Sequence, residues 1–383
     1  LRVGSPDMEV TLSGTEKGRI RVPLLHGPEV DLRVVLSPVS EAVALTELDR
    51  DPARGDFDAA RTAARNAWED VLSRVRVLDD DPDKARSKRL FYTSLYRSLL
   101  VPHNATSSHG RFRLGTDPET VRTAEEGRTH YSGWSTWDDY RKFPLVGLVS
   151  PETLGQIAES ILGLHRAGSV PTWAEGLWPT PSVRNEMMVA VVLEALSQGL
   201  IDPERVREAY KELTARHLGN PLEQAYSHWI AMRLAQRLGL EAEAEEQAEG
   251  ARSWRRHWTP DQMDVEGRPR GFMTPKGRVV KAEKADRVDA HFYEGNLWHY
   301  RWWVPHDMGG LVELDGGPDR FAQNLEYYFE SNRHMALNEP PLAYPYLFVW
   351  AGKPWLTQKW SRHFTTDTVV QIYHNHGLLK EPY

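Results

Sequence analysis

Three successive segments of this chain carry the start and stop signals of α-helices, and this punctuation limits the fold more than any other feature. They span residues 150–168, 202–219 and 220–239, open with Ser-Pro, Asp-Pro and Asn-Pro, and end at glycine. Ser, Asp and Asn side chains cap the free N–H groups of a helix, proline fits its first turn, and glycine ends it. The segments therefore predict three helices with short connections.

Helical patterns continue along most of the chain. Apolar spacing and end signals predict further helices at residues 57–77, 319–331, 354–363 and 367–376, and the almost wholly apolar residues 187–200 predict a buried helix. Helix hairpins with short connections are typical of a toroid or a solenoid. No fixed-period repeat is present, which favours a closed toroid.

The first part of the chain has a different pattern. Short apolar or alternating runs at residues 9–12, 18–22 and 30–36, separated by Gly and Pro, predict strands, and this β-rich pattern extends to about Leu48. A charged segment with Asp51-Pro52 and Gly55 follows and ends it.

Charge and composition exclude several classes of protein. The net charge is −7 and the pI is near 6.1, so we expect neither a nucleic-acid partner nor a polybasic membrane contact. No apolar run approaches the roughly 18 residues of a membrane-spanning helix, so no membrane insertion is expected. The absence of cysteine excludes disulfides, thiolate metal sites and a cysteine nucleophile. Because the chain begins with Leu1, we expect an internal fragment in which a signal peptide would not be visible.

Aromatic residues are numerous, with 14 Trp and 14 Tyr. They gather with His and carboxylates in long segments without regular pattern, at residues 103–145, 169–184, 253–311 and 333–350. Such segments in a helical domain are usually functional, and flat rings stack on sugars as well as packing in cores. A toroid with an aromatic, polar mouth would suit a carbohydrate site.

Four motifs resemble those of glycoside hydrolase family 92, in the same order. They are Phe-Tyr-Thr-Ser-Leu-Tyr-Arg at 91–97, Ser-Gly-Trp-Ser-Thr-Trp-Asp-Asp-Tyr-Arg at 132–141, Tyr-Glu-Gly-Asn-Leu-Trp-His-Tyr-Arg-Trp-Trp-Val-Pro-His-Asp at 293–307, and Asn-Glu-Pro at 338–340 with Tyr-Pro-Tyr-Leu-Phe at 344–348. The resemblance covers about residues 57–380. It implies a calcium-dependent, exo-acting α-mannosidase that inverts the anomeric carbon of mannose-containing oligosaccharides or glycans.

The resemblance also implies a domain organisation. We expect residues 1–50 to be the end of an N-terminal β-sandwich, residues 51–84 a helical linker, and residues 85–383 an (α/α)6 barrel that is incomplete at its C-terminus. The expected fold class is therefore mainly α. A secreted or periplasmic location is expected rather than a cytoplasmic one.

Two departures from the family pattern concern the chemistry. The family holds its catalytic base on an Asp-rich loop, which we expect to lie beyond Tyr383. A histidine pair normally follows Asn-Glu-Pro, whereas Pro341, Leu342 and Ala343 stand in that interval here. The second departure affects leaving-group recognition, and with it the usual preference for α-1,2 linkages.

The catalytic acid implied by the resemblance is Glu294. Inverting hydrolysis needs one protonated carboxyl group for the leaving oxygen and one carboxylate to activate water. Glu294 lies in an aromatic stretch, and apolar surroundings favour the protonated form that an acid needs. From the residues alone, Glu294 could equally cap a turn at Gly295-Asn296.

The remaining site residues are expected to bind metal or sugar. Asn338 and Glu339 offer the oxygen ligands that calcium prefers. The sugar-binding set is Trp137, Asp138, Arg141, Trp298, His306 and Asp307. Asp138 and Arg141 could instead form an i,i+3 ion pair on a helix, and His306 could tie its loop to the barrel.

Other functions stay open on the sequence. Within the enzyme class they are a mannosyl phosphodiesterase or another (α/α)6 glycosidase. Outside it, the alternative is a carbohydrate-binding protein without activity, which the altered Asn-Glu-Pro surroundings and the missing base loop suggest.

Overall fold

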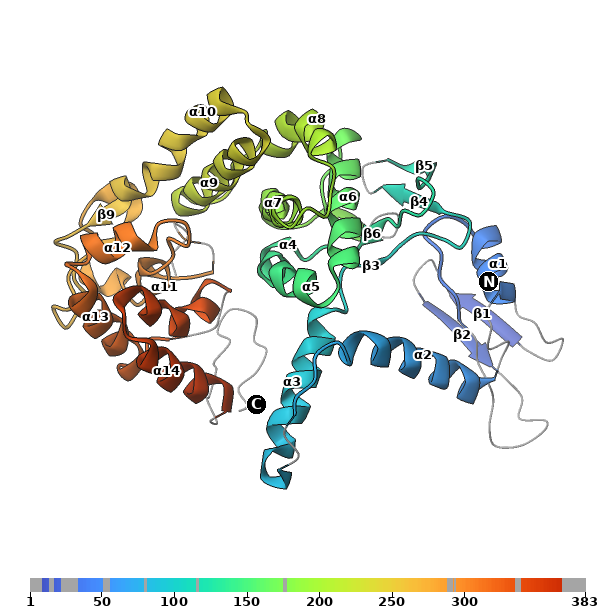
Figure 1. The fold of residues 1–383 in the computed structure, drawn as a ribbon, viewed down its shortest axis with the longest axis horizontal. Coiled ribbons are helices and arrows are strands. Elements are labelled where there is room, and N and C mark those ends of the chain that lie inside the picture. Colours follow the sequence, from blue (N-terminus) through green and yellow to red (C-terminus); the bar gives the residue numbers. More distant parts are fainter. Residues whose placement is uncertain are drawn as a thin grey trace. The chain divides into compact units, whose positions relative to one another are not determined.

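A computed structural model describes residues 9–13, 17–21, 34–50, 56–78, 81–114, 117–174, 178–287, 292, 294–334 and 339–366. The chain divides into two compact units, Leu1–Val71 and Leu72–Tyr383 (Figure 1). The boundaries expected from the resemblance, at residues 50 and 84, stay predictions. Helices dominate the described residues, so the predicted mainly α class is confirmed.

In its described residues, the first unit contains one β-hairpin and two helices, α1 (Glu41–Arg50) and nearly all of α2 (Phe57–Leu72). Strands β1 (Glu9–Ser13) and β2 (Lys17–Arg21) pair antiparallel, with Val10 opposite Ile20. Of the third predicted strand, residues 30–33 lie outside the described residues, and residues 34–36 are not in a strand. The β-rich pattern ends earlier than expected because Glu41–Arg50 forms helix α1, whose Val43 N donates to Ser40 Oγ at 3.2 Å.

The second unit is built mainly from helices. The longer ones are α3 (Ala85–Ser98), α5 (Phe143–Val149), α6 (Pro151–Arg166), α7 (Val189–Ser197), α8 (Pro203–Thr214), α9 (Pro221–Leu238), α10 (Glu241–Arg252), α12 (Met308–Leu314), α13 (Pro318–Glu330) and α14 (Pro354–Thr366). Two short α-helices, α4 (Thr136–Asp139) and α11 (Leu297–Arg301), lie in the aromatic segments. The 3₁₀ helices are η1 (Pro82–Lys84), η2 (Tyr140–Lys142), η3 (Asn185–Met188), η4 (Ser253–His257), η5 (Pro275–Gly277), η6 (Ala282–Lys284) and η7 (Pro340–Ala351).

The predicted helix starts are confirmed at α6, α8 and α9. Asp202 Oδ1 accepts from Glu204 N at 2.9 Å, and Asn220 forms a full capping box with Glu223. Gly239, with φ of +69°, ends α9 as expected, whereas α8 already ends at Thr214. The helix expected at residues 367–376 lies outside the described residues.

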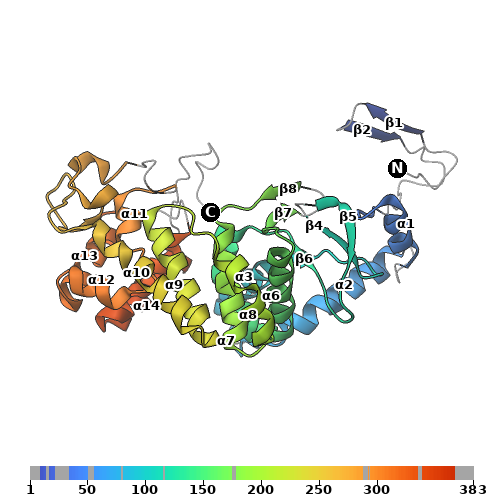
Figure 2. The same cartoon turned by 90° about the horizontal axis from the view of Figure 1, so that it is seen from above.

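Short antiparallel hairpins order the aromatic segments. They are β3 (His103–Asn104) with β6 (Tyr131–Ser132), β4 (Arg111–Leu114) with β5 (Asp117–Thr123), β7 (Thr172–Ala174) with β8 (Trp178–Pro181), and β9 (Trp258–Thr259) with β10 (Phe272–Met273). Figure 2 shows β4–β5 and β7–β8 on the same side of α6 and α8. These pairings give the long segments fixed positions that sequence patterns did not indicate.

The core of the second unit is rich in aromatic and ionic contacts. Trp134, Trp254 and Trp302 are among its fully buried side chains. Arg301 and Asp315, both buried, form an ion pair of 2.5 Å. In the described part of the chain, no helix has the length and apolar character needed to cross a membrane.

Candidate active site

Two carboxyl groups from distant parts of the sequence meet at the candidate site. Asp138 lies on α4, Glu339 directly precedes η7, and the two side chains are hydrogen bonded to each other. Burial, followed by the hydrogen bond and charge of Asp138, raises the pKa of Glu339 to about 8. Ser135 Oγ also donates to Asp138 Oδ2. Glu339 therefore keeps its proton near neutral pH, beside the carboxyl group of Asp138.

Arg141 lies beside this pair on η2. Its guanidinium packs 4.3 Å from the ring centre of Tyr140 and 4.7 Å from that of Trp137, and Nη1 donates to Trp137 O. Nη2 is buried and has no hydrogen-bond partner among the described residues. Trp137 itself is 1% exposed, so it supports Arg141 and offers no ring face to a sugar.

The expected alternative for this segment, an i,i+3 ion pair, occurs one position later. Lys142 Nζ lies 2.6 Å from Asp139 Oδ1. Asp138 is exposed and meets Glu339 instead. The structure thus separates a structural carboxylate from one that faces the site.

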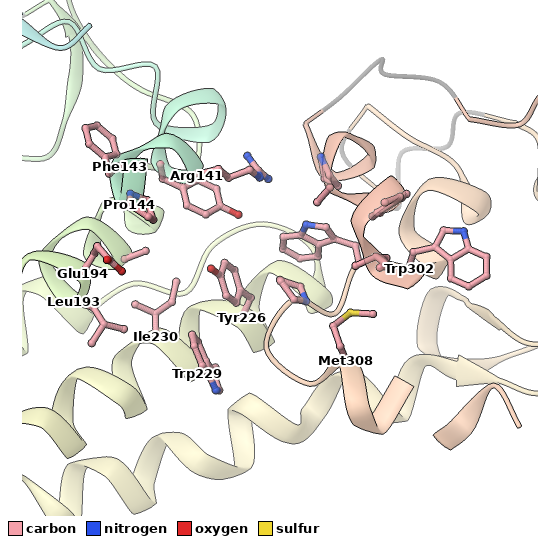
Figure 3. A pocket seen from close by; sticks show the side chains of 18 residues that line it. Arg141, Phe143, Pro144, Leu193, Glu194, Tyr226, Trp229, Ile230, Trp302 and Met308 are labelled. Carbon is pink, nitrogen blue, oxygen red and sulfur yellow. The ribbon is translucent and has the colours of Figure 1, made fainter. Parts of the chain in front are cut away.

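A pocket of about 410 Å³ adjoins Arg141 (Figure 3). One wall comes from η2, α5, α7 and α9, with Tyr226 and Trp229 labelled on α9. Trp302 and Met308 belong to the facing wall. Apart from Arg141 and Glu194, the lining is uncharged. Aromatic rings near one guanidinium suit the apolar and hydroxyl faces of a sugar.

A group of buried carboxyls lies behind the site and was not predicted. Glu223, with a wholly buried side chain, accepts from Arg184 Nε at 2.6 Å and from Tyr300 Oη at 3.2 Å, and burial raises its pKa. Burial also raises the pKa of Glu186 to about 7, and both its oxygens lack hydrogen-bond partners in the described structure. The spacing of Asn220 and Glu223 fits a capping box, which would indicate Glu223 only as a helix cap, and the sequence around Glu186 carries no signal of a buried carboxyl group.

Glu294 has an unusual backbone. Its φ is +47°, a left-handed value that non-glycine residues rarely adopt, and its side chain is half-buried. The cap of α11 is Asn296, whose Oδ1 accepts from His299 N at 3.0 Å. Asn296, and not Glu294, therefore caps α11. Residues with a left-handed backbone like that of Glu294 often occur at functional sites.

Three residues expected at the substrate have structural contacts instead. Trp298 is fully buried and packs edge-on against Phe272 at 5.0 Å, which leaves no ring face for a sugar. His306 Nε2 hydrogen bonds to Ala251 O at 3.0 Å, tying its loop to α10. Asp307 caps α12 by accepting from Gly310 N at 3.0 Å.

Asp307 also forms an ion pair with Arg255 at 3.0 Å, so both its oxygens are engaged. Asn338 lies outside the described residues. Within the described ranges, no group of three or more His, Cys, Asp or Glu side chains is placed to hold a metal ion. The Asp138–Glu339 pair nevertheless offers the hard oxygen donors that calcium takes, in a position where a cation would relieve the repulsion between them.

A family model assigns this chain. The model described as the glycosyl hydrolase family 92 catalytic domain matches residues 43–221 and 215–375. The chain belongs to glycoside hydrolase family 92. The family expected from the four motifs is confirmed.

The relatives that this chain matches are longer than the chain itself. An uncharacterised secreted glycosidase of Arthroderma benhamiae is 23% identical over 363 residues, which are 87% of this chain and 46% of the relative. The GH92 glycosyl hydrolase ccman5 is 30% identical with a TM-score of 0.72, covering 88% of this chain and 48% of its own. The chain thus spans about half the length of these relatives.

Two further structures come from Bacteroides thetaiotaomicron. The GH92 α-mannosidase BT3965 is 24% identical with a TM-score of 0.71, covering 85% of this chain and 47% of its own. The GH92 inverting mannosidase BT2199 is 24% identical with a TM-score of 0.67, covering 85% and 51%. These likenesses fit the mainly α toroid expected for the catalytic domain.

Proposed function

We propose that the protein is an exo-acting α-mannosidase that releases mannose from mannose-containing oligosaccharides or glycans with inversion. The observation that carries this proposal is the Asp138–Glu339 carboxyl pair beside Arg141, in a chain of family 92. It is supported by structural relatives named α-mannosidases, one of them in complex with mannoimidazole. Because one relative is named a secreted glycosidase, we extend the proposal to a secreted or periplasmic location.

In this mechanism Glu294 donates a proton to the leaving oxygen. Its left-handed backbone sets the direction of the Cα–Cβ bond from which the carboxyl group extends. Asp138 and Arg141 hold hydroxyl groups of the sugar, since a carboxylate accepts and a guanidinium donates strong hydrogen bonds. The buried ring of Trp137 packs against the guanidinium of Arg141 and positions it. A carboxylate outside the described residues activates the attacking water.

Calcium would be held by Glu339 and Asn338, with Asp138 nearby. When bound, the ion polarises sugar hydroxyl groups and favours distortion of the ring. The half-buried Glu339 would have to be deprotonated to serve as a ligand, because carboxyl groups bind metal ions as carboxylates.

The acid role is tested by Glu294→Gln in the full-length gene product. Hydrolysis of methyl α-mannoside should fall by about a hundredfold to ten-thousandfold. The loss should be much smaller with 2,4-dinitrophenyl α-mannoside, whose leaving group needs no proton. Equal losses on both substrates, or none on either, would exclude Glu294 as the acid.

The matched control is Glu283→Gln, an exposed carboxylate in the same irregular segment. It should leave both rates unchanged. Unaltered melting temperatures of both variants would show that the fold is intact.

One observation favours a second candidate, a mannosyl phosphodiesterase. Pro341, which is buried, and the exposed Leu342 and Ala343 occupy the interval where the family has a histidine pair, so the leaving-group side differs. Rates on a mannose-1-phosphodiester, an aryl α-mannoside and an aryl α-glucoside separate the candidates. Binding of mannosides without turnover would instead indicate a carbohydrate-binding protein.

A further inference from the structure

A second pocket, of about 230 Å³, lies between the β4–β5 hairpin and helix α6. It shares no lining residue with the pocket beside Arg141. Its walls come from both strands of the hairpin, residues 124–130, α6, and Arg205 of α8. None of the residues proposed for hydrolysis lines it, so the proposed function assigns it no role.

One wall of this pocket is fixed on α6 by hydrogen bonds. Thr129 N donates to Gln156 Oε1 at 2.9 Å, and Ser160 Oγ donates to Thr129 O at 3.1 Å. Tyr131 N in turn donates to Ser160 Oγ at 3.0 Å. The wall is thus ordered before any ligand enters, which lowers the entropic cost of binding.

Three buried polar atoms at the pocket lack hydrogen-bond partners among the described residues: His130 Nε2, Arg122 Nε and Glu159 Oε1. His130 is 5% exposed, and burial lowers its pKa to about 4, so its ring is neutral at neutral pH. Glu159 Oε1 has an ion-pair partner, Arg128 Nη1, at 3.3 Å, so it is not without a partner. Because unpartnered buried polar groups are costly, His130 Nε2 and Arg122 Nε indicate a ligand that supplies hydrogen-bonding groups.

The charges at the pocket are already balanced. Arg205 Nη2 lies 2.9 Å from Glu159 and 3.1 Å from Glu125. Arg122 Nη2 lies 3.3 Å from Asp117. Because these guanidinium groups have carboxylate partners, the pocket favours a neutral hydroxylated ligand over an anion.

An aromatic patch completes the site. Phe112 stacks on His130 with ring centres 4.2 Å apart and planes inclined by 19°. Donors and acceptors beside an aromatic ring recognise the hydroxyl edge and apolar face of a pyranose. The pocket is smaller than the roughly 300–1,000 Å³ of sites for drug-sized ligands, which fits a single ring. We propose that it is a second pyranose-binding site, which holds one sugar ring of a glycan outside the active site.

The test follows His130 directly. The full-length gene product, labelled with ¹⁵N-histidine, is titrated with methyl α-mannoside, and the His130 signals are assigned from the spectrum of His130→Gln. The ring-nitrogen shifts of His130 should change saturably. The choice of a mannoside rests on the proposed function, so methyl α-glucoside and methyl α-galactoside are titrated in parallel, and a failure of hydrolysis leaves this readout unaffected.

Gly163 supplies the variants. It lines the pocket, and a Cβ there meets no atom within 4 Å. Gly163→Phe should place a ring at the pocket and abolish the His130 response, whereas Gly163→Ala, a helix-favouring change, should keep it. Asp138→Asn should also keep it, since Asp138 lies elsewhere.

Three results would overturn the proposal. They are no saturable shift of His130 with any of the pyranosides, the same shift in a folded Gly163→Phe variant, or a response to phosphate but not to neutral sugars. The last result would make the pocket an anion site.

Discussion

The carboxyl groups of Asp138 and Glu339 are hydrogen bonded to each other, although one lies on α4 and the other at the start of η7. Burial and the neighbouring carboxyl group of Asp138 hold the pKa of Glu339 at about 8, so Glu339 keeps a proton at neutral pH and the two hydrogen-bonded groups act as one unit. This contact joins two of the family motifs into one site. It also explains why a residue expected to bind metal and one expected to bind sugar belong together.

Removing either carboxyl group of the pair should therefore have nearly the same effect as removing both. We expect Asp138→Asn and Glu339→Gln each to lower kcat/KM on an aryl α-mannoside by about a hundredfold to a thousandfold. The double variant should be little worse than the single ones, because residues that act as a unit are not additive. Fully multiplicative losses would show that the groups act independently, and the exposed Asp261→Asn serves as control.

The buried ion pair between Arg301 and Asp315 should dominate the stability of its region. Asp315→Ala would leave the buried guanidinium of Arg301 without its carboxylate partner. It would also remove the acceptor of the hydrogen bond that Asn324 Nδ2 donates to Asp315 at 2.9 Å. We expect the free energy of unfolding to fall by about 3–5 kcal/mol, measured by urea denaturation. The control is Glu249→Ala, which breaks the exposed pair with Arg256 and should change stability very little.

Stability should fall as the pH is lowered below neutrality, partly through His299. Burial lowers its pKa to about 4, whereas an unfolded histidine titrates near 6.5. Between these two pH values the His299 ring is protonated in the unfolded chain but neutral in the folded chain. The stability present above about pH 6.5 is therefore lost progressively towards pH 4. In the folded protein the His299 ring cannot readily accept this proton, because its Nδ1 already accepts a hydrogen bond from Asn296 N at 3.2 Å.

His299→Gln tests this assignment. Glutamine at the third helical position keeps the capping-box acceptor but does not titrate. The variant should lose less stability between pH 7 and pH 5 than the wild type, by up to about 1.4 kcal/mol per pH unit. His109→Gln, at an exposed position, should leave the pH dependence unchanged. An identical slope in the wild type and His299→Gln would refute the role of His299.

Local signals predicted the helices well and the contacts poorly. The Asn220 cap and Gly239 predicted the two ends of α9, because capping depends on residues a few positions apart. Trp298 was expected at the substrate, yet it is fully buried. A tryptophan in an aromatic stretch has the same sequence pattern whether it packs in a core or faces a sugar, so only tertiary structure separates the two.

The same limit applies to the site. The motifs indicated Asp138 and Glu339 separately, but no spacing rule reports a contact between distant segments. Glu186 was missed because its burial depends entirely on packing. Asp307 was expected to bind substrate, whereas its cap on α12 and its ion pair with Arg255 depend on the fold around it.

The most direct measurement is the release of mannose from an aryl α-mannoside and from α-1,2-mannobiose by the full-length gene product. It is made in buffer, after EDTA treatment, and after calcium is added back. We predict release of mannose that EDTA abolishes and calcium restores. A folded protein that releases no mannose from either substrate under any of these conditions would contradict the proposed α-mannosidase activity.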